Sequence, residues 1–146
     1  MLAIRQANSA DQEAVLTLLR IYCKEANTPL TDEHLLAGLT PLLSENQHGV
    51  VLVAEEEEII GYSILTWGWG IESGGMEALV DEMLIHPSRR GEGIGERLLQ
   101  ATLERAKHVG VKVVFLETES DNPRSRKLYS KLGFEEETSI WMSYRF

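Results

Sequence analysis

The sequence lacks several features that define whole classes of protein. It has one cysteine, Cys23, so it cannot form an internal disulfide, which is typical of a protein in a reducing compartment. No stretch approaches the roughly 18 consecutive apolar residues of a membrane span. The first residues also lack a basic segment followed by an apolar run. We therefore expect a soluble cytoplasmic protein that has no membrane partner.

Basic residues are also scarce, with 14 Lys and Arg against 23 Asp and Glu and a formal net charge of -9. An acidic protein repels nucleic acids and anionic membranes, so we expect no nucleic-acid partner. The 4 histidines are scattered without the spacing of metal ligands, so no metal site is predicted. The excess of acid favours a cationic small molecule or peptide as the partner.

The length of 146 residues fits a single domain over residues 1–146, without a repeat or linker. Apolar residues recur with both strand and helix periods, which predicts an α+β fold. The expected strands are residues 2–7, 50–54, 59–66, 78–86, 111–118 and 140–146. The expected helices follow Ser9, Thr31, Gly93 and Asn122. The last strand is predicted from the alternation of Ile140, Met142, Tyr144 and Phe146.

Three glycines at every second position, Gly91, Gly93 and Gly95, lie between an expected strand and an amphipathic helix that begins at Ile94. Glycine lets a ligand approach the backbone closely. The unpaired NH groups of a helix N-terminus carry a partial positive charge and hold phosphate groups. This loop therefore predicts a phosphate or pyrophosphate site, although a plain turn between strand and helix is the alternative.

The spacing separates the nucleotide-binding motifs that such a loop can belong to. A Walker A loop ends in Gly-Lys-Ser/Thr, and here Glu96 and Arg97 follow the last glycine, which excludes it. A dinucleotide fingerprint needs a glycine where Glu96 stands, although Glu117 lies near the distance expected for a ribose-binding acid. That second motif is the alternative.

A third pattern, Arg/Gln-x-x-Gly-x-Gly/Ala, is met by Arg90, Gly93 and Gly95, and it resembles the acetyl-CoA-binding motif of the GNAT superfamily of N-acetyltransferases. Downstream, Asn122 opens a segment that carries Tyr129 and ends in Leu-Gly-Phe at residues 132–134, which resembles the second signature of that family. Residues 81–87 are similar to its central strand. The resemblance covers residues from about 50 to 134, and the first 45 only in layout.

The resemblance implies a mixed sheet of six to seven strands with helices on both faces and a splay between the two central parallel strands. It implies an enzyme that transfers an acetyl group from acetyl-CoA, its co-substrate, to a primary amine. A non-catalytic module that senses acyl-CoA is the alternative with the same fold. The residues expected to bind acetyl-CoA are Leu84, Ile85, Arg90, Gly91, Glu92, Gly93, Ile94, Gly95 and Asn122.

The catalytic roles are placed on residues that match the family motifs. Glu82 resembles the strand carboxylate that accepts the proton of the acceptor ammonium, and Glu117 or no protein base is the alternative. Alternation along a strand predicts that Asp81 points to the opposite face. Tyr129 lies two helical turns after Asn122, and its hydroxyl is suited to protonate the departing thiolate. The backbone NH of Leu84 or Ile85 resembles the donor to the thioester carbonyl.

The acceptor is left open as a small-molecule or peptide amine. Runs of acid such as residues 55–58 and 135–137 favour a cationic acceptor. Trp67 and Trp69 line an acceptor pocket or pack the hairpin that contains them, and the sequence does not decide between the two. The alternating final strand predicts pairing or packing in a homodimer.

Overall fold

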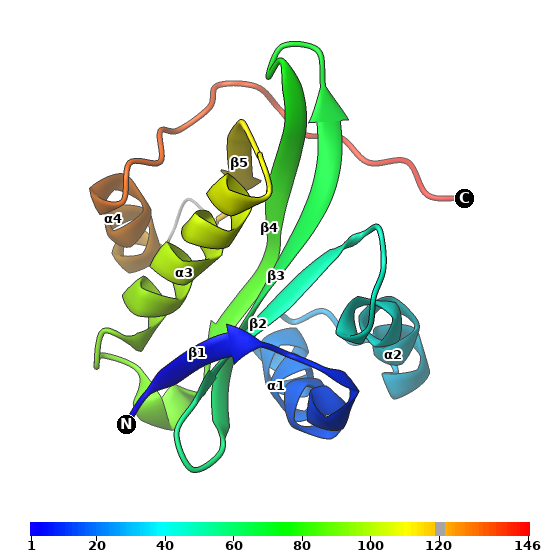
Figure 1. The fold of residues 1–146 in the computed structure, drawn as a ribbon, viewed down its shortest axis with the longest axis vertical. Helices are drawn as coiled ribbons and strands as arrows, with labels where there is room; N and C mark the ends of the chain where they lie inside the picture. The colour runs from blue at the N-terminus through cyan, green and yellow to red at the C-terminus, as the bar shows by residue number, and fades with distance from the viewer. Residues whose placement is uncertain (119–121) are drawn as a thin grey trace.

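A mixed sheet forms the centre of the computed structural model, which describes residues 1–118 and 122–146 (Figure 1). Four strands pair antiparallel with their neighbours in chain order, and the fifth pairs parallel with the fourth. A parallel pair needs a crossover connection, which the third long helix supplies. The strands are β1 (Ala3–Gln6), β2 (Gly49–Glu55), β3 (Ile59–Gly70), β4 (Gly75–Ile85) and β5 (Val113–Leu116).

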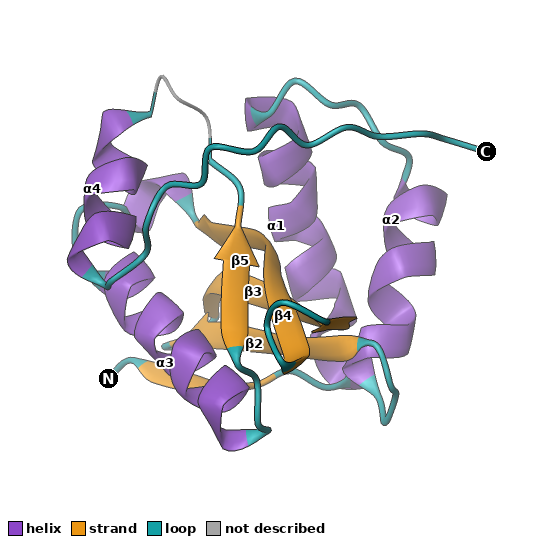
Figure 2. Cartoon of the chain, turned by 90° about the horizontal axis from the view of Figure 1, so that it is seen from above, coloured by secondary structure: helices purple, strands orange, loops and turns teal. Residues whose placement is uncertain are grey.

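Helices cover both faces of the sheet (Figures 1 and 2). Helices α1 (Gln12–Glu25) and α2 (Asp32–Leu39) lie on one face, and α3 (Ile94–His108) and α4 (Pro123–Lys131) lie on the other. Strand β2 is buried on both sides because its alternate side chains enter two cores: Val51 and Val53 pack under α1, whereas Val50 and Leu52 pack under α3. The short 3-10 helices are Ser9–Asp11, Thr40–Leu43 and Pro87–Arg89.

The predicted α+β fold with helices on both faces is confirmed, but the predicted number of strands is wrong. The sheet has five strands among the described residues, and the expected strand at residues 140–146 does not form. Three successive apolar side chains there, Ile140, Trp141 and Met142, are 87%, 74% and 91% exposed, so no face of the segment is buried. Alternation of apolar side chains does not by itself provide a neighbouring strand with which the backbone can pair. The homodimer predicted from this strand stays a prediction.

The β3–β4 hairpin is longer than the sequence predicts, because β3 continues to Gly70 and β4 begins at Gly75. Trp67 and Trp69 therefore lie within β3, opposite Ala78 and Met76. Trp67 packs against the core under α3, whereas Trp69 is 77% exposed. Of the two alternatives for these residues, packing of the hairpin applies to Trp67.

A β-bulge interrupts the β3–β4 pairing in the middle of β4. Ile64 lies opposite Glu82 and Leu65 lies opposite Val80, so Asp81 is an extra residue without a partner. The bulge changes which face the following residues occupy: Val80 packs in the core under α3, whereas Leu84 packs in the core under α1. The bulge therefore interrupts the simple alternation of β4 between Val80 and Glu82, and the expected direction of the Asp81 side chain stays a prediction.

The pairing of β4 with β5 ends just before the bulge, where Val80 lies opposite Leu116. Residues 81–85 of β4 thus have a strand partner on the β3 side only, among the residues that the structure describes. Within the described chain, no helix has the length and apolar character needed to cross a membrane.

Candidate active site

The glycine loop has the conformation that its sequence predicts. Gly91 and Gly93 adopt positive φ values of 83° and 79°, which a residue with a Cβ rarely adopts. Gly93 is the N-cap of α3, and no side chain caps the helix there. The first NH groups of α3 are therefore directed out of the helix without a side-chain acceptor. This is the arrangement that binds an anionic group at a helix N-terminus.

Both arginines beside the loop are engaged by carboxylates. Arg89 forms ion pairs with Glu56 and Glu92 at 3.1 and 3.0 Å. The guanidinium of Arg90 contacts the Glu25 carboxylate at 2.7 Å, and its Nε donates to the carbonyl oxygen of Ile85 at 2.9 Å. These two side chains therefore connect the loop to neighbouring elements, and the carboxylates of Glu25, Glu56 and Glu92 largely offset their positive charge.

A further basic side chain, that of Arg124, lies beside the loop. A Cβ built on Gly91 would lie 3.5 Å from its Nη2 atom. Arg124 belongs to the first turn of α4, and it forms no ion pair within residues 1–118 and 122–146. The sequence leaves two alternatives for Arg124, contact with the phosphates of the cofactor or a solvated helix face, and does not select between them.

Leu84 and Ile85, the two expected backbone donors, face different edges of β4. The NH of His86 donates to the carbonyl oxygen of Ile60 on β3 at 2.8 Å. Backbone groups alternate along a strand, so the NH of Leu84 also points to β3, whereas the NH of Ile85 points to the edge beyond the end of β5. The geometry thus distinguishes two residues that the sequence could not.

Glu82 lies half-buried on the face of β4 that carries α1. Its Oε1 accepts a hydrogen bond from the Tyr62 hydroxyl at 3.1 Å. Burial raises the pKa of Glu82, the bond from Tyr62 lowers it, and the nearby charge of Asp81 raises it further. The net effect is a raised pKa, which suits a carboxylate that has to take up and release a proton near neutral pH.

Asp81 shares this region with Glu82. Desolvation by the surrounding protein raises the pKa of Asp81. The phenol of Tyr22 on α1 lies close enough to both carboxylates for their charge to add to the effect of burial, and its pKa is raised. Tyr129 contributes to the same shift, so Tyr22 lies within electrostatic range of both expected catalytic residues.

Tyr129 is half-buried on α4, and its ring makes an edge contact with Phe134 at a centroid distance of 6.0 Å. Burial raises the pKa of Tyr129, and a hydrogen bond with Ser125 partly offsets this. The hydroxyl is therefore protonated at neutral pH and available as a donor. Asn122 is the N-cap of α4, and its side chain accepts the NH of Ser125 at 3.3 Å. Asn122 therefore caps α4 in this structure.

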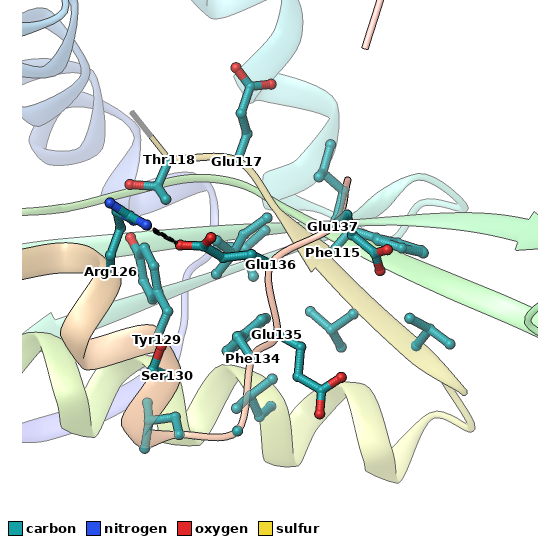
Figure 3. A pocket seen from close by; sticks show the side chains of 18 of the residues that line it. Phe115, Glu117, Thr118, Arg126, Tyr129, Ser130, Phe134, Glu135, Glu136 and Glu137 are labelled. Carbon is teal, nitrogen blue, oxygen red and sulfur yellow. Dashed lines mark hydrogen bonds and ion pairs between the residues drawn. The ribbon is translucent and has the colours of Figure 1, made fainter. Parts of the chain in front are cut away.

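A cavity of about 750 Å³ lies between β4, β5, α4 and the C-terminal segment (Figure 3). Tyr129 lies beside the ion pair of Arg126 and Glu136 in this cavity, whereas the Glu117 carboxylate points away from them. The lining within the described residues includes neither Glu82 nor the glycine loop. Its ionisable members are Asp81, Glu117, Arg126, Tyr129, Glu135, Glu136 and Glu137.

The structure thus brings Glu82, Asp81 and Tyr129 within electrostatic range of Tyr22, and places the loop of residues 90–95 at the start of α3. Sequence reasoning missed the contact of Tyr62 with Glu82 and the bulge before Glu82. Both depend on the β3–β4 register, which has no local sequence signal.

Comparisons with known proteins agree on one family. The model of the acetyltransferase (GNAT) family matches residues 13–134. An uncharacterized N-acetyltransferase, YhfO, from Bacillus subtilis (strain 168) is 32% identical over 138 residues, which cover 94% of this chain and 92% of the relative. The L-amino acid N-acyltransferase MnaT from Escherichia coli (strain K12) is 33% identical over 86 residues, which cover 58% of this chain and 49% of the relative.

A solved structure of the aminoglycoside N-acetyltransferase AAC(6')-Iy in complex with CoA superposes with a TM-score of 0.83 at 23% identity, covering 100% of this chain and 96% of that one. At this identity the likeness concerns the fold. The family match covers most of the chain, and the Bacillus relative is similar over nearly its whole length. The chain therefore belongs to the acetyltransferase (GNAT) family and is an acetyl-CoA-dependent acyltransferase of the N-acetyltransferase type.

Proposed function

We propose that the protein acetylates a primary amine by direct attack on acetyl-CoA, with Glu82 as the general base and Tyr129 as the general acid. One observation carries this proposal: a half-buried carboxylate with a raised pKa and a protonated phenol both lie within electrostatic range of Tyr22, and the carboxylate is on the part of β4 that has no β5 partner among the described residues. A base and an acid whose protonation states differ at neutral pH are what amine acetylation needs.

The loop and its surroundings fit the pyrophosphate of acetyl-CoA. The uncapped N-terminus of α3 offers NH donors, the bare backbone at Gly91 and Gly93 permits close approach, and Arg124 supplies a positive charge. When bound, acetyl-CoA supplies a thioester: the C–N bond to the acceptor forms, the C–S bond breaks, and the acetyl group passes to nitrogen.

The side chains of the chain move the protons of this transfer. The Glu82 carboxylate takes one proton from the acceptor ammonium, which frees the nitrogen lone pair, and later releases that proton to solvent. The NH of Ile85 donates to the carbonyl oxygen, where negative charge develops. The Tyr129 hydroxyl gives its proton to the departing sulfur. The second proton of the amine leaves to solvent and restores the phenol through water.

Gly93→Ala tests the loop. We expect acetyl-CoA to bind about tenfold more weakly, because a residue with a Cβ disfavours the positive φ of 79° that orients the first turn of α3. Isothermal titration of the free protein measures the affinity, with NAD and ATP as parallel ligands. The unmodified protein is expected to bind acetyl-CoA one to one, and neither NAD nor ATP.

Gly110→Ala is the matched control for this variant. Gly110 follows α3 at its opposite end and has a φ of 95°, so the substitution strains the backbone in the same way far from the loop. Both variants are expected to lose about 1 kcal/mol of stability. Equal affinity of the two variants for acetyl-CoA would contradict the loop as its binding site, and binding of NAD instead would restore the dinucleotide alternative.

We also propose that the acceptor is cationic. The cavity beside Tyr129 is lined by five carboxylate side chains against the guanidinium of Arg126, which is paired with Glu136. The Escherichia coli relative is named for L-amino acids, whose carboxylate this lining would repel. A structurally similar aminoglycoside acetyltransferase was solved with sisomicin, a likeness that concerns the fold at 20% identity and a TM-score of 0.78.

A panel of primary amines tests the charge of the acceptor. Thiol release should give a kcat/KM at least about tenfold higher for polyamines and amino sugars than for amino acids. The advantage should shrink as salt is raised, since screening weakens the attraction between exposed charges. Faster acetylation of anionic amines would overturn the cationic acceptor and leave the catalytic roles intact. Binding of acetyl-CoA without thiol release from any amine would favour a non-catalytic module.

A further inference from the structure

Tyr62 is the most deeply buried ionisable side chain near the expected base. It lies on β3 with 0% of its surface exposed, and its ring packs with Val51, Val53 and Leu84 in the core under α1. Its hydroxyl donates to Oε1 of Glu82 at 3.1 Å. A core side chain therefore reaches out of the core and fixes one oxygen of a carboxylate on the neighbouring strand.

The strand register explains why these two side chains meet. Tyr62 lies directly opposite Leu84, and Glu82 lies two positions before Leu84 on the same face. Diagonal neighbours on antiparallel strands come within reach of one another when one side chain is long or aromatic. Because the bulge at Asp81 adds one residue to β4, the Glu82 side chain lies on this face and not on the opposite one. The contact thus depends on a backbone feature as well as on the two residues.

The groups around Glu82 leave Tyr62 as its hydrogen-bond donor in the described structure. Asp81 on the same strand bears the same charge and raises the pKa of Glu82. On α1, Tyr22 and Cys23 lie within electrostatic range of the carboxylate, and its charge adds to burial in raising the pKa of both. Burial and the charge of Glu82 raise the pKa of Tyr62 far above neutrality, so its hydroxyl is protonated and can donate around neutral pH.

We propose that Tyr62 is the positioning residue for the base: its buried hydroxyl holds one oxygen of Glu82 in place and leaves the other oxygen to accept the proton of the acceptor amine. The proposal rests on the role of Glu82 proposed above. A catalytic carboxylate must be held within a narrow range of orientations to act efficiently. The core supplies that rigidity because the Tyr62 ring cannot move without disturbing its packing.

The free protein provides the first test. Tyr62→Phe keeps the ring and removes the hydroxyl, and the titration of Glu82 is followed by NMR of 13C-labelled glutamate carboxyls, assigned by the signal missing in Glu82→Gln. We expect the midpoint of Glu82 to move to higher pH, because the lost bond stabilised the charged form. Tyr22→Phe is the matched control and should leave the midpoint in place. An unchanged midpoint in Tyr62→Phe would overturn the proposal.

A measurement on the unmodified protein keeps the test independent of folding of the variant. The ring 13C signal of Tyr62 next to its hydroxyl should shift with the same midpoint as the Glu82 carboxyl, because the two groups share one hydrogen bond. A Tyr62 signal that ignores the titration of Glu82 would overturn the proposal even if Tyr62→Phe failed to fold.

Activity then separates this inference from the proposed base. On the alkaline plateau of the pH–rate profile, Tyr62→Phe should lower kcat by roughly threefold to tenfold and keep KM for acetyl-CoA within about twofold. The pH range in which the activity of this variant falls on the acidic side should move to higher pH. Suppose that Glu82→Gln abolishes the fall of activity at acidic pH, whereas Tyr62→Phe changes neither this fall nor kcat. The positioning role of Tyr62 is then wrong, and the role of Glu82 as the base stands. If Glu82→Gln keeps the fall of activity at acidic pH, Glu82 is not the base, and the positioning role of Tyr62 is wrong as well.

Discussion

Glu82→Gln is expected to lower kcat/KM for acetyl transfer by about 10²- to 10⁴-fold, because an amide cannot accept the proton of the acceptor ammonium. The pH profile gives the sharper result. A carboxylate acts as a base only when it is deprotonated, so activity of the unmodified protein should fall as the pH drops through the pKa of Glu82. Burial raises that pKa, so this acidic limb should lie above the range of an ordinary glutamate.

The measurement is the initial rate of thiol release from about pH 5 to about pH 9 at subsaturating amine. The matched control is Glu77→Gln, which removes a half-buried glutamate from the same strand near the hairpin end of β4, where Glu77 accepts a bond from Ser73 at 2.6 Å. The control should keep the rate and the acidic limb. A Glu82→Gln enzyme with both features intact would rule out this base and direct attention to Glu117, which lines the neighbouring cavity.

Tyr129→Phe is expected to reduce kcat by about 10- to 100-fold with little change in KM, because the departing sulfur loses its proton donor at the step where the C–S bond breaks. The phenylalanine ring keeps the edge contact with Phe134, so the packing of α4 should persist. Steady-state kinetics at saturating acceptor measure the loss.

A change of leaving group shows whether the lost group acts as an acid. An acetyl thioester of a more acidic thiol needs less help to depart, so the difference between Tyr129→Phe and the unmodified enzyme should shrink with it. Tyr144→Phe is the control, since Tyr144 is 84% exposed near the end of the chain. An equal loss with both thioesters would argue against proton donation by Tyr129 and for a role in packing or binding.

The parts of the site that depend on neighbours in the chain could be predicted from the sequence. Helix α3 begins at Ile94 after a loop with positive φ at Gly91 and Gly93, because glycine spacing encodes a turn of this kind locally. Asn122 caps α4 just before Pro123, as an Asn-Pro pair predicts. Both features require only a few adjacent residues, and the structure has them where the sequence puts them.

The parts that depend on distant partners could not be predicted. Arg90 contacts Glu25, which lies 65 residues earlier in the chain, and a carboxylate at that distance leaves no trace in the motif. The contact between Tyr62 and Glu82 depends on the register of two strands and on one extra residue. The alternation in residues 140–146 predicted a strand, but pairing requires a free sheet edge within reach, which a periodicity cannot specify.

The extra residue in β4, Asp81, decides on which face of the sheet the Glu82 side chain lies. From Glu82 onward, each side chain occupies the side of the sheet that its neighbour would take in an uninterrupted strand. The number of residues before Glu82, more than the identity of Asp81, therefore decides whether the carboxylate faces α1 and Tyr62 or the opposite core under α3. Under the role proposed for Glu82, an insertion or deletion of one residue in β4 before Glu82 would move the base to the other face of the sheet.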